Sequence, residues 1–249
     1  MSRAASSGSA AAAAHRASSA LTNYFKRSER PLQSLAFVTI LIVIYEIGYR
    51  AGDSQLLAFN LLREFFSIFG ATAPFLPAFA IAAILLVWHI ARREDWTIDV
   101  RNLAFMALES FLLALPLLAL SAAVSRWGVR SPLIAIHGNF TDRVVISIGA
   151  GVYEELIFRL IGLTLLHLLL VDVLKMRPKP AAILMVFLSG LMFSLYHYLG
   201  SESFAWRTCV FRTVAGMYFG AIFLCRGFGI TAGSHTAYDL IVTTLGALG

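Results

Sequence analysis

Charged residues are scarce in this chain. Asp, Glu, Lys and Arg make up 14% of its 249 residues, whereas 59% are hydrophobic. A soluble domain would carry roughly 25% charged residues and about 45–50% apolar ones. The shift in both directions argues against an ordinary soluble domain and predicts a helical membrane protein.

Cysteine is almost absent as well. Cys209 and Cys225 both lie in apolar stretches without the spacing of metal ligands, so we interpret them as packing residues and expect no disulfide framework. The sequence also lacks the His-Glu-x-x-His signature of many zinc peptidases. The net charge of +6 does not indicate nucleic acid, because the basic residues are scattered between apolar segments, as the positive-inside bias explains.

Apolar stretches near the ~20 residues needed to cross a bilayer recur along the chain. They predict an all-α, polytopic transmembrane helix bundle with about seven crossings, and six or eight remain alternatives. The fourth stretch is too long for a simple crossing, so it is expected to tilt or to extend beyond the bilayer. We place the stretches at 34–50, 74–91, 102–124, 142–171, 181–199, 207–225 and 228–248.

Two segments, residues 1–33 and 54–70, are not predicted to cross the membrane. Residues 1–33 are rich in Ala, Ser and Arg and predict a disordered tail, with a short amphipathic helix around Leu21–Lys26 as the alternative. Residues 54–70 mix apolar positions with charge, which favours an interfacial helix within an N-terminal transmembrane region spanning 34–139.

The distribution of Lys and Arg predicts the orientation. It favours a cytoplasmic N-terminus, with Arg207 and Arg212 counted at outer helix ends. Size and composition suggest an integral protein of a bacterial cell membrane.

Three polar clusters interrupt the C-terminal apolar stretches. Ionised groups at bilayer depth cost at least ~2.5–3.5 kcal/mol each and normally face the interior of a bundle, so clusters on three segments are expected to meet. The clusters are Glu154 with Glu155 and Arg159, then His197, then His235 with Asp239.

Helix geometry separates the roles of the two glutamates. Residues four apart share a face, so Arg159 is expected to pair with Glu155. Glu154 is rotated by about 100° and is left free to accept a proton from water. The same spacing lets Asp239 orient the ring of His235 and favour its charged form.

Each cluster also has a structural interpretation. Glu155 and Arg159 could form a buried bridge, His197 could bond a neighbouring helix, and His235 with Asp239 could be a satisfied polar pair. Counting residues along the helices puts Glu154 and His235 at one level of the membrane. His197 lies more than a turn away from that level.

Two other acidic residues lie within or near apolar stretches. Glu46 and Glu109 are interpreted as interhelical hydrogen-bonding or cavity-wall residues.

The ordered motifs resemble a known family. Glu154-Glu155-x-x-x-Arg159, Phe193-x-x-x-His197 and His235-x-x-x-Asp239 are similar to the three signature motifs of the CPBP intramembrane proteases. That family includes type II CAAX prenyl endopeptidases and bacterial relatives linked to self-immunity. The resemblance covers about residues 140–249, which we therefore expect to be the catalytic transmembrane region.

The resemblance implies a glutamate-dependent endopeptidase that hydrolyses a peptide bond in a membrane-associated peptide or protein. Glu154 and His197 would activate the attacking water, and His235 and Asp239 would stabilise the oxyanion, with Glu155 and Arg159 supporting them. The family usually has Asn where this chain has Asp239. Because an ionised Asp cannot donate a hydrogen bond, either Asp239 is protonated or it only orients and charges His235, and we favour the second role.

Alternatives remain for both cofactor and function. The glutamate mechanism needs no metal, but Glu154, His197 and His235 could instead hold zinc with one position open for water. The protein could also be a non-enzymatic immunity or binding protein that keeps the protease fold. A proton-coupled transporter is less favoured, because the sequence shows no inverted repeat. The sequence specifies neither the oligomeric state nor whether the substrate is prenylated.

Overall fold

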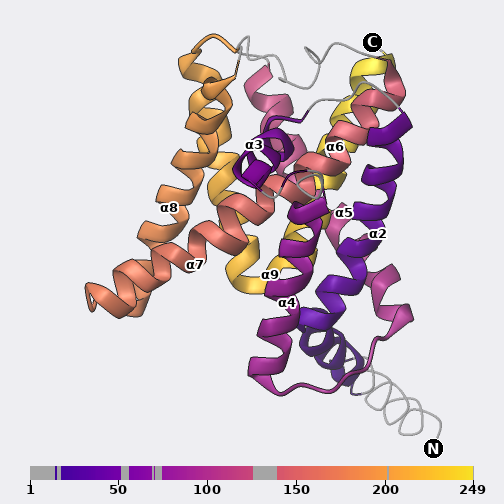
Figure 1. Cartoon of the computed structure of the whole chain (residues 1–249), viewed down its shortest axis with the longest axis vertical. Coiled ribbons are helices and arrows are strands. Elements are labelled where there is room, and N and C mark those ends of the chain that lie inside the picture. The colour runs from indigo at the N-terminus through magenta and orange to yellow at the C-terminus, as the bar shows by residue number, and fades with distance from the viewer. Residues whose placement is uncertain are drawn as a thin grey trace, which may run out of the picture.

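A computed structural model describes residues 15, 18–51, 56–68, 70, 75–125, 139–200 and 202–248. In these ranges the chain is helical and contains no strand. The helices pack into one bundle (Figure 1), which confirms the predicted all-α transmembrane architecture.

The helices follow one another with short connections. Prolines stand at the first positions of α2 and α8 and near the start of α4, where the missing N–H costs no hydrogen bond. Asn139 and Asp142 form a capping box that starts α6. The helices are α2 (Pro31–Ala51), α3 (Leu57–Phe65), α4 (Leu76–Arg92), α5 (Val100–Ser125), α6 (Phe140–Glu155), α7 (Gly162–His167), α8 (Pro178–Tyr196) and α9 (Trp206–Leu248), with π-helical η3 (Leu156–Ile161) and η4 (Leu168–Val173) and the 3-10 turn η5 (His197–Leu199).

α9 is a helical hairpin rather than one straight helix. Gly227 interrupts it with φ 77° and ψ −178°, a conformation that glycine adopts without steric cost. The ring of Phe219, before this turn, stacks on the ring of His235, after it, with centroids 4.5 Å apart. The chain therefore folds back on itself at Gly227 (Figure 1).

All seven predicted apolar stretches are helical in the described residues. Five helices there are long and apolar enough to cross a membrane, with α9 counted once, and α4 is a shorter apolar helix. The number of crossings stays a prediction.

The fourth predicted stretch belongs to one helical run from Phe140 to Val173. Figure 1 shows this run slanting across the bundle, with α6 and α7 at its two ends. Whether this long segment is accommodated by a tilt in the bilayer or by extension beyond it stays a prediction.

The outer surface of the bundle is apolar. Ile47 on α2 and Phe79 on α4 are each 66% exposed, and Leu112 on α5 is 52% exposed. Apolar surface on long apolar helices is suited to lipid contact, so the chain is an integral membrane protein. Cys209 is buried, as expected for a packing residue, whereas Cys225 is exposed.

The predicted disorder of residues 1–33 does not hold for residues 18–33. Residues 18–28 are helical, as in the alternative interpretation, and α2 begins at Pro31. Tyr24 packs edge-on against Phe105 of α5, and Arg27 Nη1 lies 2.6 Å from Asp99 Oδ2. These contacts anchor the segment despite its composition. Residues 1–14, 16 and 17 lie outside the described residues.

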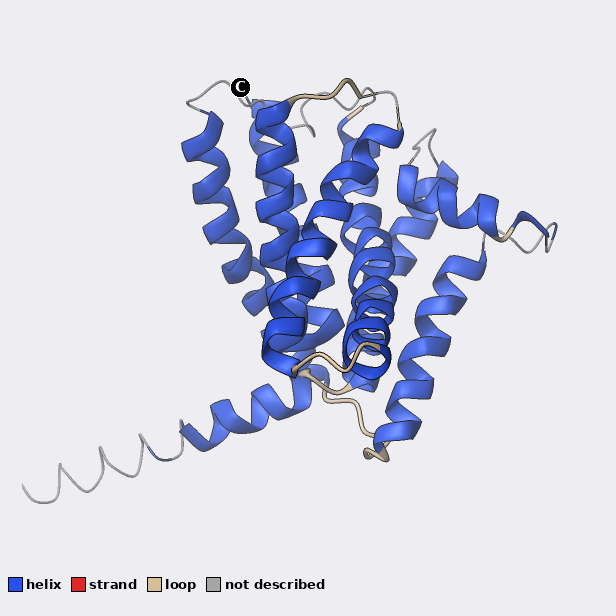
Figure 2. Cartoon of the chain, turned by 90° about the vertical axis from the view of Figure 1, so that its left-hand side faces the viewer, coloured by secondary structure: helices blue, strands red, loops and turns tan. Residues whose placement is uncertain are grey.

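The predicted interfacial segment contains α3. This helix lies across the bundle direction (Figure 2), with Ala58 and Phe59 buried and Arg63 and Glu64 exposed. One apolar and one charged face suit an interface, although its depth in the bilayer stays a prediction. Residues 52–55 and 71–74 lie outside the described residues.

Candidate active site

The two adjacent glutamates lie where α6 ends and the π-helical turn η3 begins. Such π-turns inside helices occur frequently at functional sites. One turn earlier, a Cβ added to Gly151 would lie only 2.5 Å from the backbone nitrogen of Thr236. The absence of a side chain at Gly151 therefore allows α6 to touch α9, which brings both glutamates beside His235.

Glu155 forms the buried ionic centre behind the site. Its Oε1 lies 3.0 Å from Arg159 Nη1 and accepts a hydrogen bond of 2.8 Å from His235 Nδ1. Arg159 Nη2 donates to the carbonyl of Gly216 at 2.9 Å, and its guanidinium lies over the ring of Phe193. The predicted Glu155–Arg159 pair is confirmed, and its position suits a supporting role.

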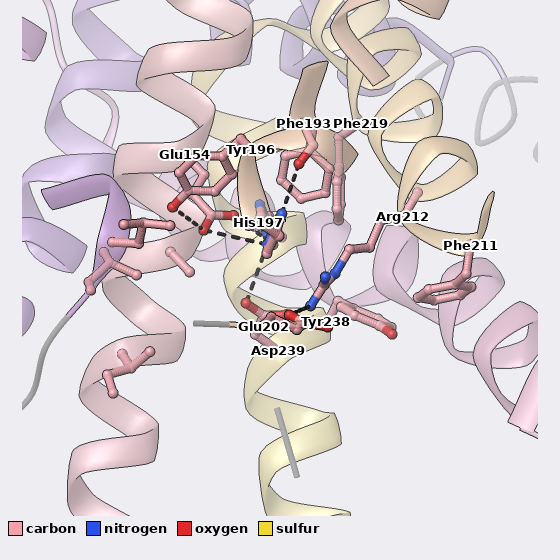
Figure 3. Close-up of a pocket in the computed structure, with 16 residues that line it drawn as sticks. Glu154, Phe193, Tyr196, His197, Glu202, Phe211, Arg212, Phe219, Tyr238 and Asp239 are labelled. Atoms are coloured by element: carbon pink, nitrogen blue, oxygen red, sulfur yellow. Dashed lines mark hydrogen bonds and ion pairs between the residues drawn. The ribbon is translucent and has the colours of Figure 1, made fainter. Parts of the chain in front are cut away.

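Glu154 points the other way, into a cavity (Figure 3). Its Oε1 lies 3.9 Å from His197 Nε2, and its Oε2 lies 3.8 Å from His235 Nε2. Both separations exceed a direct hydrogen bond. Tyr196 donates its hydroxyl to Glu154 Oε1 at 3.3 Å. One buried carboxylate thus lies between two imidazole nitrogens at spacings that a small polar molecule can bridge.

The tautomer of His197 follows from its own hydrogen bond. Nδ1 lies 2.8 Å from the carbonyl oxygen of Phe193, which can only accept, so Nδ1 carries the hydrogen. In the neutral ring, Nε2 then offers its lone pair on the side of Glu154. Residue counting had placed His197 more than a turn away. In the structure its helix, α8, begins at Pro178, before the predicted stretch 181–199, and His197 lies beside Glu154.

His235 is held by three contacts. Glu155 binds Nδ1, Asp239 Oδ2 lies 3.5 Å from Nε2, and Phe219 stacks on the ring face. The short bond that orients the ring comes from Glu155 and not, as predicted, from Asp239. The aspartate on the same helix reaches the ring only at this longer distance, whereas Glu155 approaches it from α6.

The predicted residues converge on one cavity of about 260 Å³. Glu154, His197, His235 and Asp239 line it, whereas Glu155 and Arg159 lie behind its wall. Much of the remaining lining is apolar and comes from segments far apart in the sequence, including Leu56, Leu57, Ile146, Ala150, Phe193, Phe211, Ala215 and Phe219.

Two further charged residues line this cavity, and the sequence analysis did not identify them as site residues. Arg212 Nη2 donates to Glu202 Oε2 at 2.8 Å. A signal was present, because Arg212 stands inside the apolar stretch 207–225, where an ionisable residue marks a candidate functional site.

Whether the site holds a metal ion stays a prediction. Across the described part of the chain, no three His, Cys, Asp or Glu side chains are arranged to hold a metal ion. His197 and His235 face different oxygens of Glu154, at 3.9 and 3.8 Å.

A buried carboxylate and two imidazoles thus lie around one cavity in a membrane helix bundle, an arrangement that suits an intramembrane protease. Comparison with known families agrees: residues 138–241 match the family model described as type II CAAX prenyl endopeptidase Rce1-like. The matched C-terminal region, somewhat less than half of the chain, is similar to that family and contains all three motifs. The family supports a CAAX-type intramembrane protease. No curated protein and no solved structure matches the chain significantly.

Proposed function

We propose that the protein is a glutamate-dependent intramembrane endopeptidase. Glu154 and His197 activate the attacking water, and His235 stabilises the oxyanion. The observation that supports this assignment is the convergence of side chains from α6, η5 and α9 around the Glu154 carboxylate, each imidazole within 4 Å of it.

Water activation follows from the spacing of two acceptors. Glu154 Oε1 and His197 Nε2 are 3.9 Å apart, so one water oxygen can lie about 2.8 Å from both. Glu154 takes a proton from this water while its oxygen attacks the carbonyl carbon of the scissile peptide bond. His197 accepts the second hydrogen bond and orients the water, and the Tyr196 hydroxyl holds the carboxylate in place.

Collapse of the tetrahedral intermediate needs an anion stabiliser and a proton donor. In the proposal His235 acts as an imidazolium, with Nδ1–H bound to Glu155 and Nε2–H directed at the oxyanion. Asp239 lies beside Nε2 and supports the positive charge. Glu154 then returns its proton to the leaving nitrogen as the C–N bond breaks, which yields a carboxylic acid and an amine.

The substrate in this proposal is a membrane-associated peptide or protein. The apolar cavity lining suits apolar residues around the scissile bond, and the bilayer confines enzyme and substrate together. The distribution of Lys and Arg supports a cytoplasmic N-terminus, as in a bacterial cell membrane.

We further propose that the reaction needs no metal, since the carboxylate and imidazoles supply a base and an anion stabiliser. Activity should survive prolonged treatment with a strong zinc chelator. Loss of cleavage that only added zinc restores would overturn this point and support the Glu154, His197 and His235 ligand set.

The deciding experiment removes the base. Purified protein in liposomes is offered a library of membrane-anchored fluorogenic peptides, with and without a prenyl group. Glu154→Gln should lower cleavage by about 10³-fold, within the range of a lost general base, and leave thermal stability intact. Glu46→Gln is the matched control, because Glu46 accepts a hydrogen bond from Tyr153 and does not line the cavity.

Two outcomes would contradict the proposal. Unchanged cleavage by Glu154→Gln would rule out this residue as the base. Wild-type protein that binds the peptides and cleaves none would favour the non-enzymatic binding protein.

A further inference from the structure

Arg212 is the charged residue of the cavity wall that the proposed chemistry does not use. It lies on the first half of α9, and only 6% of its side chain is exposed. Its Nη1 is buried and has no hydrogen-bond partner among the described residues. A buried donor without an acceptor is costly, so the position suits a ligand that brings an acceptor.

Glu202 satisfies Arg212 only in part. One of its oxygens accepts from Nη2 at 2.8 Å, whereas a guanidinium can offer two parallel N–H groups to one carboxylate. The other carboxylate nearby, Asp239, is directed at His235 instead. Arg212 therefore lines the cavity with one of its donors, Nη1, buried and unpaired among the described residues.

The position of Glu202 allows its carboxylate to separate from Arg212. It lies in the non-helical segment 202–205 between η5 and α9, and 39% of its side chain is exposed. Water can therefore solvate the Glu202 carboxylate when it separates from Arg212. The buried Arg212 then needs another carboxylate as its partner, because an unpaired buried charge is costly. Figure 3 shows Arg212 reaching Glu202 within the cavity, away from Glu154.

We propose that Arg212 binds a carboxylate of the peptide substrate, and that Glu202 holds this position until the substrate arrives. The inference rests on the proposed peptidase function and adds a specificity element to it. The carboxylate is either the free C-terminus of the substrate or an acidic side chain near the scissile bond. Its capture sets the register of the peptide, because Glu154 and Arg212 lie apart in one cavity.

The test uses pairs of membrane-anchored peptides that differ in one group. One pair ends in a free carboxylate or in an amide. A second series is amidated throughout and carries Asp or Asn at each position beside the scissile bond. Cleavage is measured with wild type, Arg212→Gln, Arg212→Lys and Glu202→Gln, all as full chains in liposomes. Thermal unfolding verifies that each variant is folded.

Wild type should prefer the carboxylate member of one pair by about tenfold or more, the size expected for a charge-assisted double hydrogen bond. Arg212→Gln should abolish this preference, because it should slow cleavage of the carboxylate member far more than cleavage of the amide member. Arg212→Lys should recover part of it, since lysine keeps the charge but not the fork. Glu202→Gln should lower KM for the carboxylate peptide alone, because the competing group loses its charge. A preference for the free C-terminus or for Asp shows which of the two groups supplies the carboxylate that Arg212 binds.

Equal rates within every pair would overturn the inference, as would an Arg212→Gln variant that slows both members of a pair alike. If wild type cleaves nothing, fluorescence anisotropy of the labelled peptides still decides. Tighter binding of the carboxylate member that disappears in Arg212→Gln supports the inference even though the peptidase function fails. Equal binding of both members of the pair would overturn the inference.

Discussion

Arg226 and Arg159 differ in how completely their hydrogen bonds are satisfied. Arg226, beside the turn of α9, uses its whole guanidinium. Nε and Nη2 donate to Glu109 at 2.6 and 2.9 Å, Nη2 also donates to Ser28 at 2.7 Å, and Nη1 donates to Glu29 at 2.7 Å. This Arg226 cluster (Ser28, Glu29, Glu109 and Arg226) ties the N-terminal segment, α5 and α9 together. The predicted interhelical role of Glu109 is confirmed.

In the candidate site, by contrast, several buried polar atoms lack hydrogen-bond partners among the described residues. Arg159 contacts Glu155 through charge, but Nε and Nη1 of Arg159 and Oε2 of Glu155 lack hydrogen-bond partners in the described residues. Glu154 lies 3.8–3.9 Å from both imidazoles. A network with every group paired rigidifies a fold, whereas one with free groups can receive a ligand. The comparison therefore sets a fully paired cluster against a candidate site that keeps unpaired groups.

The largest effect is expected from Glu155→Gln, which breaks the ionic centre of the site. Removing one partner of a buried pair costs about 3–5 kcal/mol, because Arg159 keeps an uncompensated charge. His235 also loses the carboxylate on Nδ1, so cleavage should fall by roughly 10²–10⁴-fold. Thermal unfolding and turnover should both decline, unlike in Glu154→Gln, where only turnover does. A stable and active variant would show that Glu155 is dispensable.

Arg226→Met should show the opposite pattern. It removes four hydrogen bonds of the Arg226 cluster and should lower stability by about 3 kcal/mol, near the range for a broken buried pair. Turnover per folded molecule should stay within about twofold of wild type, because these groups do not line the cavity. The measurement is thermal unfolding in one detergent, with turnover assayed well below the transition. Lost turnover at unchanged stability would give the cluster a functional role.

The sequence predicted local relationships well. Apolar stretches, each long enough for a helix, predicted the seven helical segments. The four-residue spacing predicted the pairing of Glu155 with Arg159, which lie 3.0 Å apart in the structure. The cost of charge in a bilayer singled out the three clusters that meet in the structure. Each inference needed only helix geometry or the nature of the solvent.

Long-range pairings could not be predicted in this way. The bond from His235 to Glu155 depends on how closely α6 and α9 cross at Gly151, which no local spacing encodes. Averaged composition concealed the helix at residues 18–28, whose few aromatic and charged side chains hold it to the bundle. Arg212 was assigned to an outer helix end because orientation counting placed the basic residues other than Arg159 in loops or at helix ends.

A third prediction moves the two helices of the site apart. In Gly151→Ala the new Cβ would meet the Thr236 backbone nitrogen at 2.5 Å, so α6 and α9 have to separate. Overpacking of this kind costs about 1–3 kcal/mol. A shift of Glu154 relative to His235 by around 1 Å should lower kcat by as much as about 10²-fold.

The matched control for this variant is Gly220→Ala, also on α9. There a new Cβ would meet Val186 no closer than 3.6 Å, which is ordinary contact. Its stability should equal or slightly exceed that of wild type, because alanine favours a helix over glycine by about 1 kcal/mol. If Gly151→Ala behaved like Gly220→Ala, the close crossing would not be what positions the glutamates.

The smallest effect is expected from Tyr196→Phe, which removes one hydroxyl from the site and keeps the ring packed against Phe158. The lost bond to Glu154 is long, at 3.3 Å, so about 0.5–1.5 kcal/mol and a roughly two- to tenfold fall in kcat/KM are expected. Tyr153→Phe removes an equivalent bond, to Glu46 at 3.2 Å, but outside the cavity. It should leave kcat/KM unchanged. Equal losses in both variants would mean that buried hydroxyls matter here for packing alone, and the contrast between complete and incomplete networks would then not extend to Tyr196.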